Sequence, residues 1–308
     1  MDKTGRVLVF GAAGIDTLAQ SSLRAHESVP GTITTAPGGV ACNVALNLAR
    51  LGVDVSLVAC IGDDDDGRRV THEIAHAGVD TRYLSILHSQ NTARYVALLD
   101  DDGDMRLAVS SMDTVEKLTA ADVTALRAET RSAAALVADA NLPTDTLREV
   151  LTAGGTALRC VDTVSAAKSP RVTDCLANTD ILKTTSAEAS ALTGVDPERA
   201  SDLCSALLDR GVGIVFLSLG AKGLRVAMPG FSETLVAPST GRVHSTSGAG
   251  DALLAGIVLG RLMGESVIDA ANLGLAAASL TLACDTSTRA SLSRELLIET
   301  RKQRATNA

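Results

Sequence analysis

Short β-rich runs alternate with helical patterns along most of this chain of 308 residues. We expect strands at 7–10, 55–60, 135–138, 157–161, 181–183 and 214–218, separated by helices such as those at 40–51 and up to about residue 77. Parallel strands need a crossover connection, which is usually a helix. The alternation therefore predicts an α/β fold with a doubly wound, mainly parallel sheet that is flanked by helices.

The alternation is interrupted at about residues 17–36 and again at about 90–112. In the second interruption, the strand-like runs Thr92–Leu99 and Met105–Ser110 flank a turn that contains Gly103. This pattern predicts a β-hairpin. An antiparallel flap beside a parallel sheet can act as a lid over a ligand. We therefore expect a single domain over residues 1–308 with a small β-sheet lid built from these two segments.

Composition limits the partners of such a domain. The chain is 46% apolar and only 2% aromatic, and its net charge is −8. An acidic chain lacks the basic footprint of a nucleic-acid-binding protein, so we expect a small-molecule ligand. We expect no membrane span, because no apolar run approaches the needed length. Six scattered cysteines and the lack of a secretory leader before residue 6 predict a cytoplasmic protein with reduced thiols.

Two glycines flank a single acid at the start of the apolar run 252–259, in the segment Gly248-Ala-Gly-Asp251. The first N–H groups of a helix have no intrahelical partner and lie at the positive end of the helix dipole, so they can hold a phosphoryl group. The same dipole is expected to keep Asp251 ionised, as a base for an attacking hydroxyl. The pattern favours phosphoryl transfer, and an ordinary Asp in a helix first turn is the alternative.

The first predicted strand ends in Gly11-Ala-Ala-Gly14-Ile-Asp16. Ligands of α/β proteins bind at the carboxyl ends of strands, so Asp16 is a candidate acceptor for sugar hydroxyls. A dinucleotide fingerprint is a weaker interpretation, because Thr17 stands where a third glycine is needed.

The segment Ala36-Pro-Gly-Gly39 opens a predicted helix that carries Asn43, Asn47 and Arg50 on one stripe. One interpretation makes this stripe the solvent face of the helix. The other places Asn43 against hydroxyls of a ligand, above a close approach at the two glycines.

Two further patterns are weighed against known motifs. Ser218-Leu-Gly-Ala-Lys-Gly223 ends a strand and could hold nucleotide phosphates, whereas a P-loop motif is absent from the sequence.

His72-Glu-Ile-Ala-His76 matches the zinc motif H-E-x-x-H. The apolar stripe of that helix places both histidines on the solvent side, so we expect no zinc site there.

Taken in order, these motifs resemble the PfkB, or ribokinase-like, family of sugar and nucleoside kinases. They are Gly11 to Asp16, Pro37-Gly-Gly with Asn43, Gly62-x-Asp64-x-x-Gly67, Ser218-x-Gly220-x-x-Gly223 and Gly248-Ala-Gly-Asp251. The resemblance implies a ribokinase-like sheet with a β-lid over the sugar. It also implies ATP with Mg²⁺ and transfer of the γ-phosphoryl group to a primary hydroxyl.

The resemblance implies the following site residues. Asp251 is the base, and Gly248, Ala249 and Gly250 form the anion hole. The sugar is held by Asp16, Gly38, Gly39 and Asn43. The nucleotide contacts Lys183, Thr185, Ser218, Gly220 and Gly223, and Glu188 binds the metal through water. The chain departs from the family at Gly14 and Thr185, where Asn is usual, and at Ser245, where Asp is usual, so a monovalent-cation site is left open.

Within the family, segments 108–113, 137–142 and 161–168 resemble pseudouridine kinases. This implies transfer to the 5′-hydroxyl of a nucleoside, with pseudouridine as the expected substrate. The implied substrate contacts are Thr92, Tyr95, Ser111, Asp113, Asn141 and Lys168. The alternatives are a kinase for another sugar or nucleoside and a non-catalytic binding relative. A homodimer through the lid is compatible with this interpretation.

Overall fold

The structure is a computed structural model that describes residues 5–22, 24, 26–103, 105–237 and 245–307. Its main sheet has nine strands in the order β13-β12-β11-β10-β9-β8-β1-β4-β5. Neighbours from β11 to β5 are parallel, and β12 and β13 pair antiparallel at one edge. The strands are β1 (Val7–Phe10), β4 (Val55–Gly62), β5 (Leu84–Leu87), β8 (Ala135–Asp139), β9 (Leu158–Asp162), β10 (Ile181–Thr185), β11 (Ile214–Ser218), β12 (Leu224–Met228) and β13 (Phe231–Leu235). The predicted α/β architecture is confirmed.

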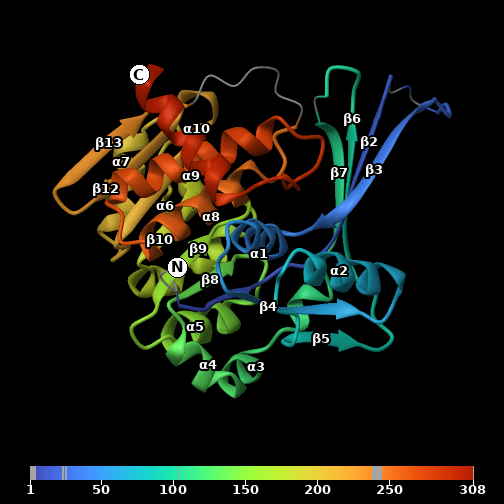
Figure 1. Ribbon diagram of the computed structural model, residues 1–308, viewed down its shortest axis with the longest axis horizontal. Helices are drawn as coiled ribbons and strands as arrows, with labels where there is room; N and C mark the ends of the chain where they lie inside the picture. The colour runs from blue at the N-terminus through green and yellow to red at the C-terminus, as the bar shows by residue number, and fades with distance from the viewer. Residues whose placement is uncertain (1–4, 23, 25, 104, 238–244, 308) are drawn as a thin grey trace.

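Helices cover both faces of this sheet (Figure 1). Successive residues of a strand point to opposite faces, so Val7 and Val9 of β1 join one apolar cluster whereas Leu8 and Phe10 join the other. The first cluster includes residues of α1 (Val40–Arg50), α2 (Asp65–His76), α8 (Ala249–Leu262), α9 (Val267–Leu282) and α10 (Arg294–Asn307). The second includes residues of α3 (Ala120–Ala125), α5 (Thr144–Ala153), α6 (Ser186–Thr193) and α7 (Ala200–Leu208), while α4 (Arg127–Ser132) contacts α5.

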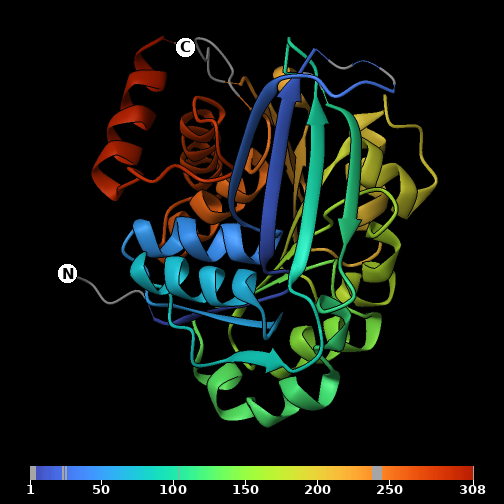
Figure 2. The same cartoon turned by 90° about the vertical axis from the view of Figure 1, so that its right-hand side faces the viewer.

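A second sheet of four strands rises from the body of the molecule as the lid (Figures 1 and 2). Its order is β3-β2-β6-β7, with β2 (Gly14–Ser21), β3 (Gly31–Gly38), β6 (Ala93–Leu99) and β7 (Met105–Ser111). It combines the two segments in which the α/β alternation is interrupted, and β6 with β7 is the predicted hairpin. Residues 23, 25 and 104 of these segments lie outside the described residues.

Helix α2 supports the lid from below. Arg69 donates to the hydroxyl and the carbonyl oxygen of Thr35 in β3, at 2.8 and 2.9 Å. Arg94 of β6 pairs with Asp66 near the start of the same helix. The lid is therefore fixed to the body at two of its strands.

The six cysteines are free thiols, and all except Cys284 are buried. Among the described residues, no helix is long and apolar enough to cross a membrane.

Candidate active site

Helix α8 begins at a left-handed glycine, Gly248, whose φ is +74°. A Cβ at this position would lie 1.8 Å from the carbonyl oxygen of Ser287, and one at Gly250 would lie 2.6 Å from Nζ of Lys183. Glycine is therefore required at Gly248 by its backbone conformation and by the contact with Ser287, whereas a side chain at Gly250 would displace the ammonium group of Lys183. The turn of Gly248, Ala249 and Gly250 leads directly to Asp251, whose side chain is buried. His244, which precedes this turn in the sequence, lies outside the described residues.

Asp251 accepts a hydrogen bond of 2.7 Å at Oδ2 from Nδ2 of Asn43. Burial, followed by the nearby charge of Asp162, raises the pKa of Asp251 to about 7, while Lys183 and Asn43 act in the opposite direction. Desolvation therefore acts against the ionisation that the helix dipole was expected to favour. A carboxyl group with this pKa can exchange a proton with a substrate near neutral pH.

Two of the three residues in the polar stripe of α1 are buried, and the third, Arg50, is half-buried. Asn43 and Asn47 are 3% and 0% exposed, because α8 packs against α1. The interpretation of this stripe as a solvent face is therefore wrong. Oδ1 of Asn43 has no hydrogen-bond partner among the described residues, so it is a free acceptor beside Asp251 for a hydroxyl donor.

Lys183, the third residue of β10, extends its side chain to this turn. Its Nζ pairs with Oδ2 of Asp162 at 3.0 Å. Burial alone would lower the pKa of Lys183, but the carboxylates of Asp162, Glu188 and Asp251 together raise it above its ordinary value. The lysine therefore stays protonated and supplies a fixed positive charge next to the helix start. The family resemblance implies a nucleotide contact for Lys183, whereas Asp162 belongs to none of the recognised motifs.

Glu188 is fixed in the first turn of α6. Its Oε2 accepts from the hydroxyl of Thr163 at 2.5 Å and from the backbone N–H of Thr185 at 2.9 Å. The hydroxyl of Thr185 in turn accepts from the N–H of Glu188, which completes a capping box. Thr185, the residue that replaces the usual Asn, thus serves as the helix N-cap.

Asp16 lies at the base of the lid, in β2. Burial raises its pKa, and a hydrogen bond from the hydroxyl of Ser287 at 3.0 Å opposes that shift. Ser287 also bonds Ser247, at 2.9 Å, just before the glycine turn. A Cβ at Gly38 would lie 2.1 Å from the carboxylate of Asp16. Ser287, for which no local sequence signal exists, therefore links Asp16 to the glycine turn at Gly248.

The register of the lid decides which of its residues share a face with Asp16. Asp16 is paired with Tyr95, and Tyr95 with Ser110. Ser111 pairs with Arg94 and therefore lies on the opposite face, toward α2. Ser110, and not Ser111, shares the face of Asp16.

Thr92 is also engaged elsewhere. Its hydroxyl and its backbone N–H both donate to Asp64, and the hydroxyl accepts from the N–H of Gly62 at 3.1 Å. Thr92 therefore ties the lid to the start of α2, and its polar atoms are already bonded within the protein.

Asn141, just after β8, and Lys168, in the connection between β9 and β10, form a polar pair. Nζ of Lys168 bonds Oδ1 of Asn141, and the carbonyl oxygen of Asn141 accepts from Arg171 at 2.6 Å. Asp113 follows β7 and is exposed.

A small hollow lies at the junction of body and lid. It is lined by Ala12, Asp16, Gly39, Tyr95 and Met112, among others.

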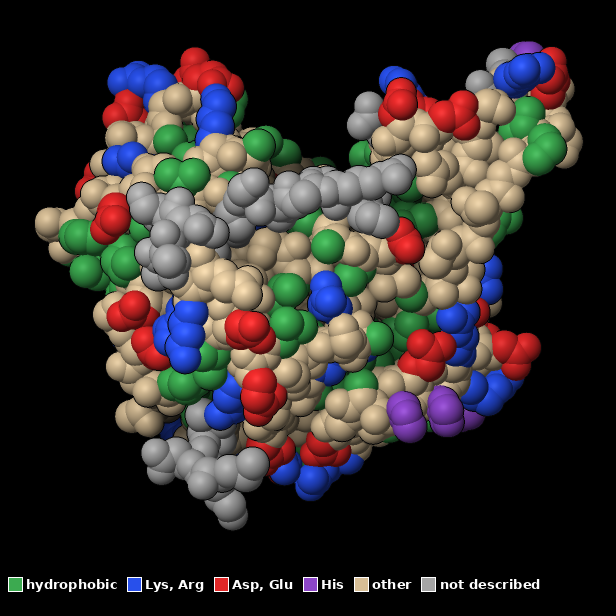
Figure 3. Space-filling model, turned by 45° about the horizontal axis from the view of Figure 1, so that its top comes forward, with side chains coloured by type: hydrophobic (Ala, Val, Ile, Leu, Met, Phe, Trp, Pro, Cys, Tyr) green, Lys and Arg blue, Asp and Glu red, His purple; other side chains and the backbone are tan. Residues whose placement is uncertain are grey.

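The predicted phosphate-binding turn follows β11. Ser218 is paired with Thr185 on the neighbouring strand. Gly220 and Gly223 have φ of +60° and +106°, and a Cβ at Gly223 would lie 2.0 Å from the carbonyl oxygen of Leu235. Ser218 and Thr185 are the last residues of their strands, so this turn lies at the carboxyl edge of the parallel strands. On the face that Figure 3 shows, the molecule is hollowed between body and lid.

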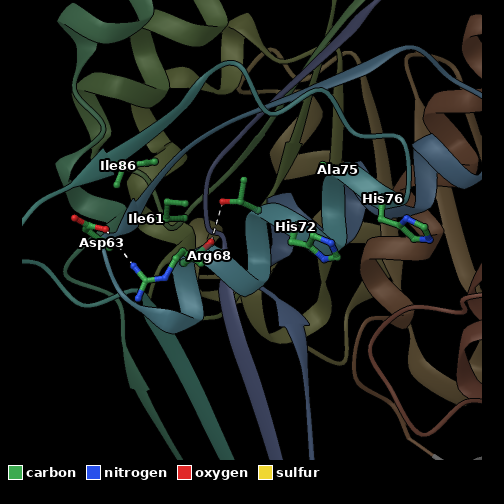
Figure 4. Close-up of a pocket in the computed structure, with 10 residues that line it drawn as sticks. Ile61, Asp63, Arg68, His72, Ala75, His76 and Ile86 are labelled. Carbon is green, nitrogen blue, oxygen red and sulfur yellow. Dashed lines mark hydrogen bonds and ion pairs between the residues drawn. The ribbon is translucent and has the colours of Figure 1, made fainter.

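A groove of about 420 Å³ lies elsewhere, between α2 and β5 (Figure 4). It is lined by none of the predicted site residues. His72 and His76 at its rim are exposed and stacked, with ring centroids 6.5 Å apart. No group of three or more metal-ligating side chains occurs in the described part of the chain. The solvent-side placement of both histidines is confirmed.

Comparison with known proteins matches residues 4–293 to the model of the pfkB family carbohydrate kinases. The chain is 30% identical over 292 residues to the pseudouridine kinase of Escherichia coli, covering 93% of each chain. It is 33% identical over 295 residues to the uncharacterized sugar kinase YeiI of the same organism, covering 94% of this chain and 81% of that one.

Among solved structures, the ribokinase of Arabidopsis thaliana complexed with ribose and ATP superposes with a TM-score of 0.85 at 22% identity. The alignment covers 97% of this chain and 99% of that one. This similarity establishes the ribokinase-like fold of the body and its lid.

Proposed function

The chain belongs to the pfkB family of carbohydrate kinases, and from that premise we propose that it transfers the γ-phosphoryl group of ATP to the 5′-hydroxyl of a nucleoside, with pseudouridine as the substrate. The observation that carries the proposal is the buried carboxylate of Asp251 at a glycine turn, bonded to Asn43 and close to the charged Lys183.

In the proposed reaction, Asp16 and Asn43 orient the sugar so that its 5′-hydroxyl points at Asp251. Oδ1 of Asn43 is free to accept from a sugar hydroxyl, because Nδ2 is used by Asp251. As the 5′-oxygen bonds to the γ-phosphorus, Asp251 accepts the hydroxyl proton, the bond from the γ-phosphorus to the bridging oxygen breaks, and ADP leaves. The N–H groups of the turn at Gly248–Gly250 and the charge of Lys183 stabilise the negative charge on the migrating phosphoryl group.

We propose that ATP lies along the ends of β10 and β11, against Thr185, Ser218, Gly220 and Gly223. Mg²⁺ usually keeps several waters and binds few carboxylates together with substrate phosphates. The chemistry of Glu188 fits that mode, because its carboxylate is held in place by Thr163 and Thr185 beside Lys183. The metal would neutralise phosphate charge there.

The proposed base-reading groups are Asn141, Lys168, Tyr95 and Asp113, with Ser110 in place of Ser111. Pseudouridine carries a second ring N–H that uridine lacks, and a polar pocket discriminates strongly between such edges. The name of the E. coli relative supports this substrate. The ribose-bound plant ribokinase supports the second candidate, a kinase for a free sugar.

We also propose a homodimer formed through the lid. Ile33, Leu107 and Val109 are 73%, 56% and 62% exposed. The register places all three on the face that is turned away from Asp16. A second copy would cover these apolar side chains.

The dependence on ATP and the six free thiols support a cytoplasmic location.

The experiment is to incubate the protein with ATP, Mg²⁺ and pseudouridine and to analyse the products by mass spectrometry and ³¹P NMR. The proposal predicts pseudouridine 5′-phosphate in stoichiometric amount with ADP. Phosphorylation of ribose but of no nucleoside would favour the second candidate. ADP release that does not depend on any acceptor would contradict both.

A further inference from the structure

A buried carboxylate outside the proposed reaction connects three parts of the substrate site. Asp139, at the carboxyl end of β8, is 1% exposed. Its Oδ2 accepts from the backbone N–H of Ala12 and from that of Ala41, both at 2.9 Å, and its Oδ1 accepts from the N–H of Asn141 at 2.8 Å. Charge-assisted bonds of this kind are stronger than neutral ones and fix the groups that donate them.

Each of these N–H groups begins a segment that carries a proposed substrate contact. Ala12 precedes the strand with Asp16, and Ala41 lies in the first turn of α1, two residues before Asn43. Asn141 is itself a proposed contact to the base. The donors are 127, 98 and 2 residues away from Asp139 in sequence. One side chain therefore joins the sugar side and the base side of the site.

The surrounding backbone is built for this contact. Gly11 has a φ of +147°, and a Cβ there would lie 2.3 Å from Oδ2 of Asp139. Only glycine allows the carboxylate to approach the end of β1 this closely. On the other side, Asn141 is held by Arg171 at its carbonyl oxygen and by Lys168 at its side chain. The position of Asn141 thus depends on Asp139 at its N–H and on two cations elsewhere.

We propose that Asp139 is a positioning residue that holds the turn before Asp16, the start of α1 with Asn43, and Asn141 in the arrangement that binds the nucleoside. It reaches the substrate only through these segments. The predicted change in KM rests on the proposed function. The predicted change in the mobility of the three segments does not, and it can be measured without activity.

The test is Asp139→Asn, which keeps the shape of the side chain. An amide has one acceptor oxygen, so its NH₂ group must face at least one of the three N–H donors. Asp80→Asn is the matched control, because Asp80 also accepts several bonds, from Ser56 and from the backbone and side chain of Arg82, but lies away from the site. A second variant, Asp139→Ser, has an uncharged hydroxyl oxygen as its only side-chain acceptor. The same measurements are made on this variant if the Asn variant fails to fold.

In the substrate-free protein, amide hydrogen exchange in segments 11–13, 40–42 and 140–142 should rise about 10-fold or more in the Asp139 variant and stay unchanged in the Asp80 control. KM for pseudouridine should rise by about 10-fold or more, with KM for ATP within about twofold of wild type. A lower Tm and a lower kcat with an unchanged KM for pseudouridine would indicate a purely structural role and overturn the proposal.

Unchanged exchange in the three segments would also overturn it, whatever the activity. A wild-type protein that phosphorylates no acceptor would instead contradict the proposed function. The exchange measurement would then still decide whether Asp139 holds these segments, so the two failures can be told apart.

Discussion

At the scale of single residues, Asp251 is the group on which the proposed chemistry depends. Asp251→Asn keeps the hydrogen bond from Asn43 and removes the base, so it should preserve binding of ATP and nucleoside while lowering kcat by roughly 100-fold or more. Binding is measured by calorimetry and kcat by ADP release. Asp162, which pairs with Lys183, is unsuitable as a control, whereas Asp80→Asn should leave kcat unchanged. Near-normal turnover in a folded Asp251→Asn protein would exclude this carboxylate as the base.

The raised pKa of Asp251 predicts two opposite effects of pH. The base must be ionised, so kcat should increase as pH rises through about 7. Stability should change in the other direction. A folded-state pKa above the ordinary value of 3.8 gives a contribution that is complete below that value and is lost as pH rises through about 7.

Asp251→Asn does not titrate at this position. The Tm of the variant should therefore exceed that of wild type more at pH 8 than at pH 4, as followed by circular dichroism. A difference in Tm that is independent of pH would show that burial does not raise this pKa.

Some residues of the candidate site could not be predicted from the sequence, because they are far apart in the chain and meet only in the folded structure. Glycine signals mark Gly248 to Asp251, Gly38, Gly39 and Gly223 because local backbone geometry requires them. Asp162, Ser287 and Asp139 carry no such local signal. Ser287 meets Asp16 across 271 residues, and Asp139 meets Ala12 across 127. Their roles arise only when the sheet and helices bring them together.

At the scale of elements, the burial of a strand decides whether its sequence pattern reveals it. The central parallel strands were predictable because they are buried on both faces and read as continuous apolar runs. The edge strands β5 and β13 are partly or largely exposed and have mixed patterns, so the sequence did not predict them. The face on which Ser111 lies could not be predicted either. A shift of one residue in register moves a side chain to the other face of a strand.

The exposed histidines of helix α2 can be tested for a role in activity or in zinc binding. His72 and His76 are exposed, and neither contacts any proposed catalytic group. Replacing both by Ala should therefore leave kcat and KM unchanged, and a zinc-specific chelator under saturating Mg²⁺ should have no effect. The check is steady-state kinetics together with metal analysis. Stoichiometric zinc that disappears in the double variant would revive the zinc interpretation.

At the scale of the whole molecule, the exposed apolar face of the lid bears on assembly. An isolated small sheet with apolar side chains on its outer face gains stability when a partner covers it. The charged substitution Val109→Asp should therefore shift the protein toward monomer, as measured by analytical ultracentrifugation. Ala108→Asp, on the adjacent exposed position of the opposite face, is the matched control. A monomeric wild-type protein would contradict the proposed dimer.

The central claim of a nucleoside kinase is tested most directly by competition. Equal concentrations of pseudouridine, uridine and ribose are offered in one reaction with limiting ATP, and the three phosphorylated products are quantified by mass spectrometry. The initial product ratio then equals the ratio of kcat/KM values. One hydrogen bond to the base edge that uridine and ribose cannot make predicts an excess of pseudouridine 5′-phosphate of roughly 10-fold or more. An excess of ribose phosphate would contradict the nucleoside assignment.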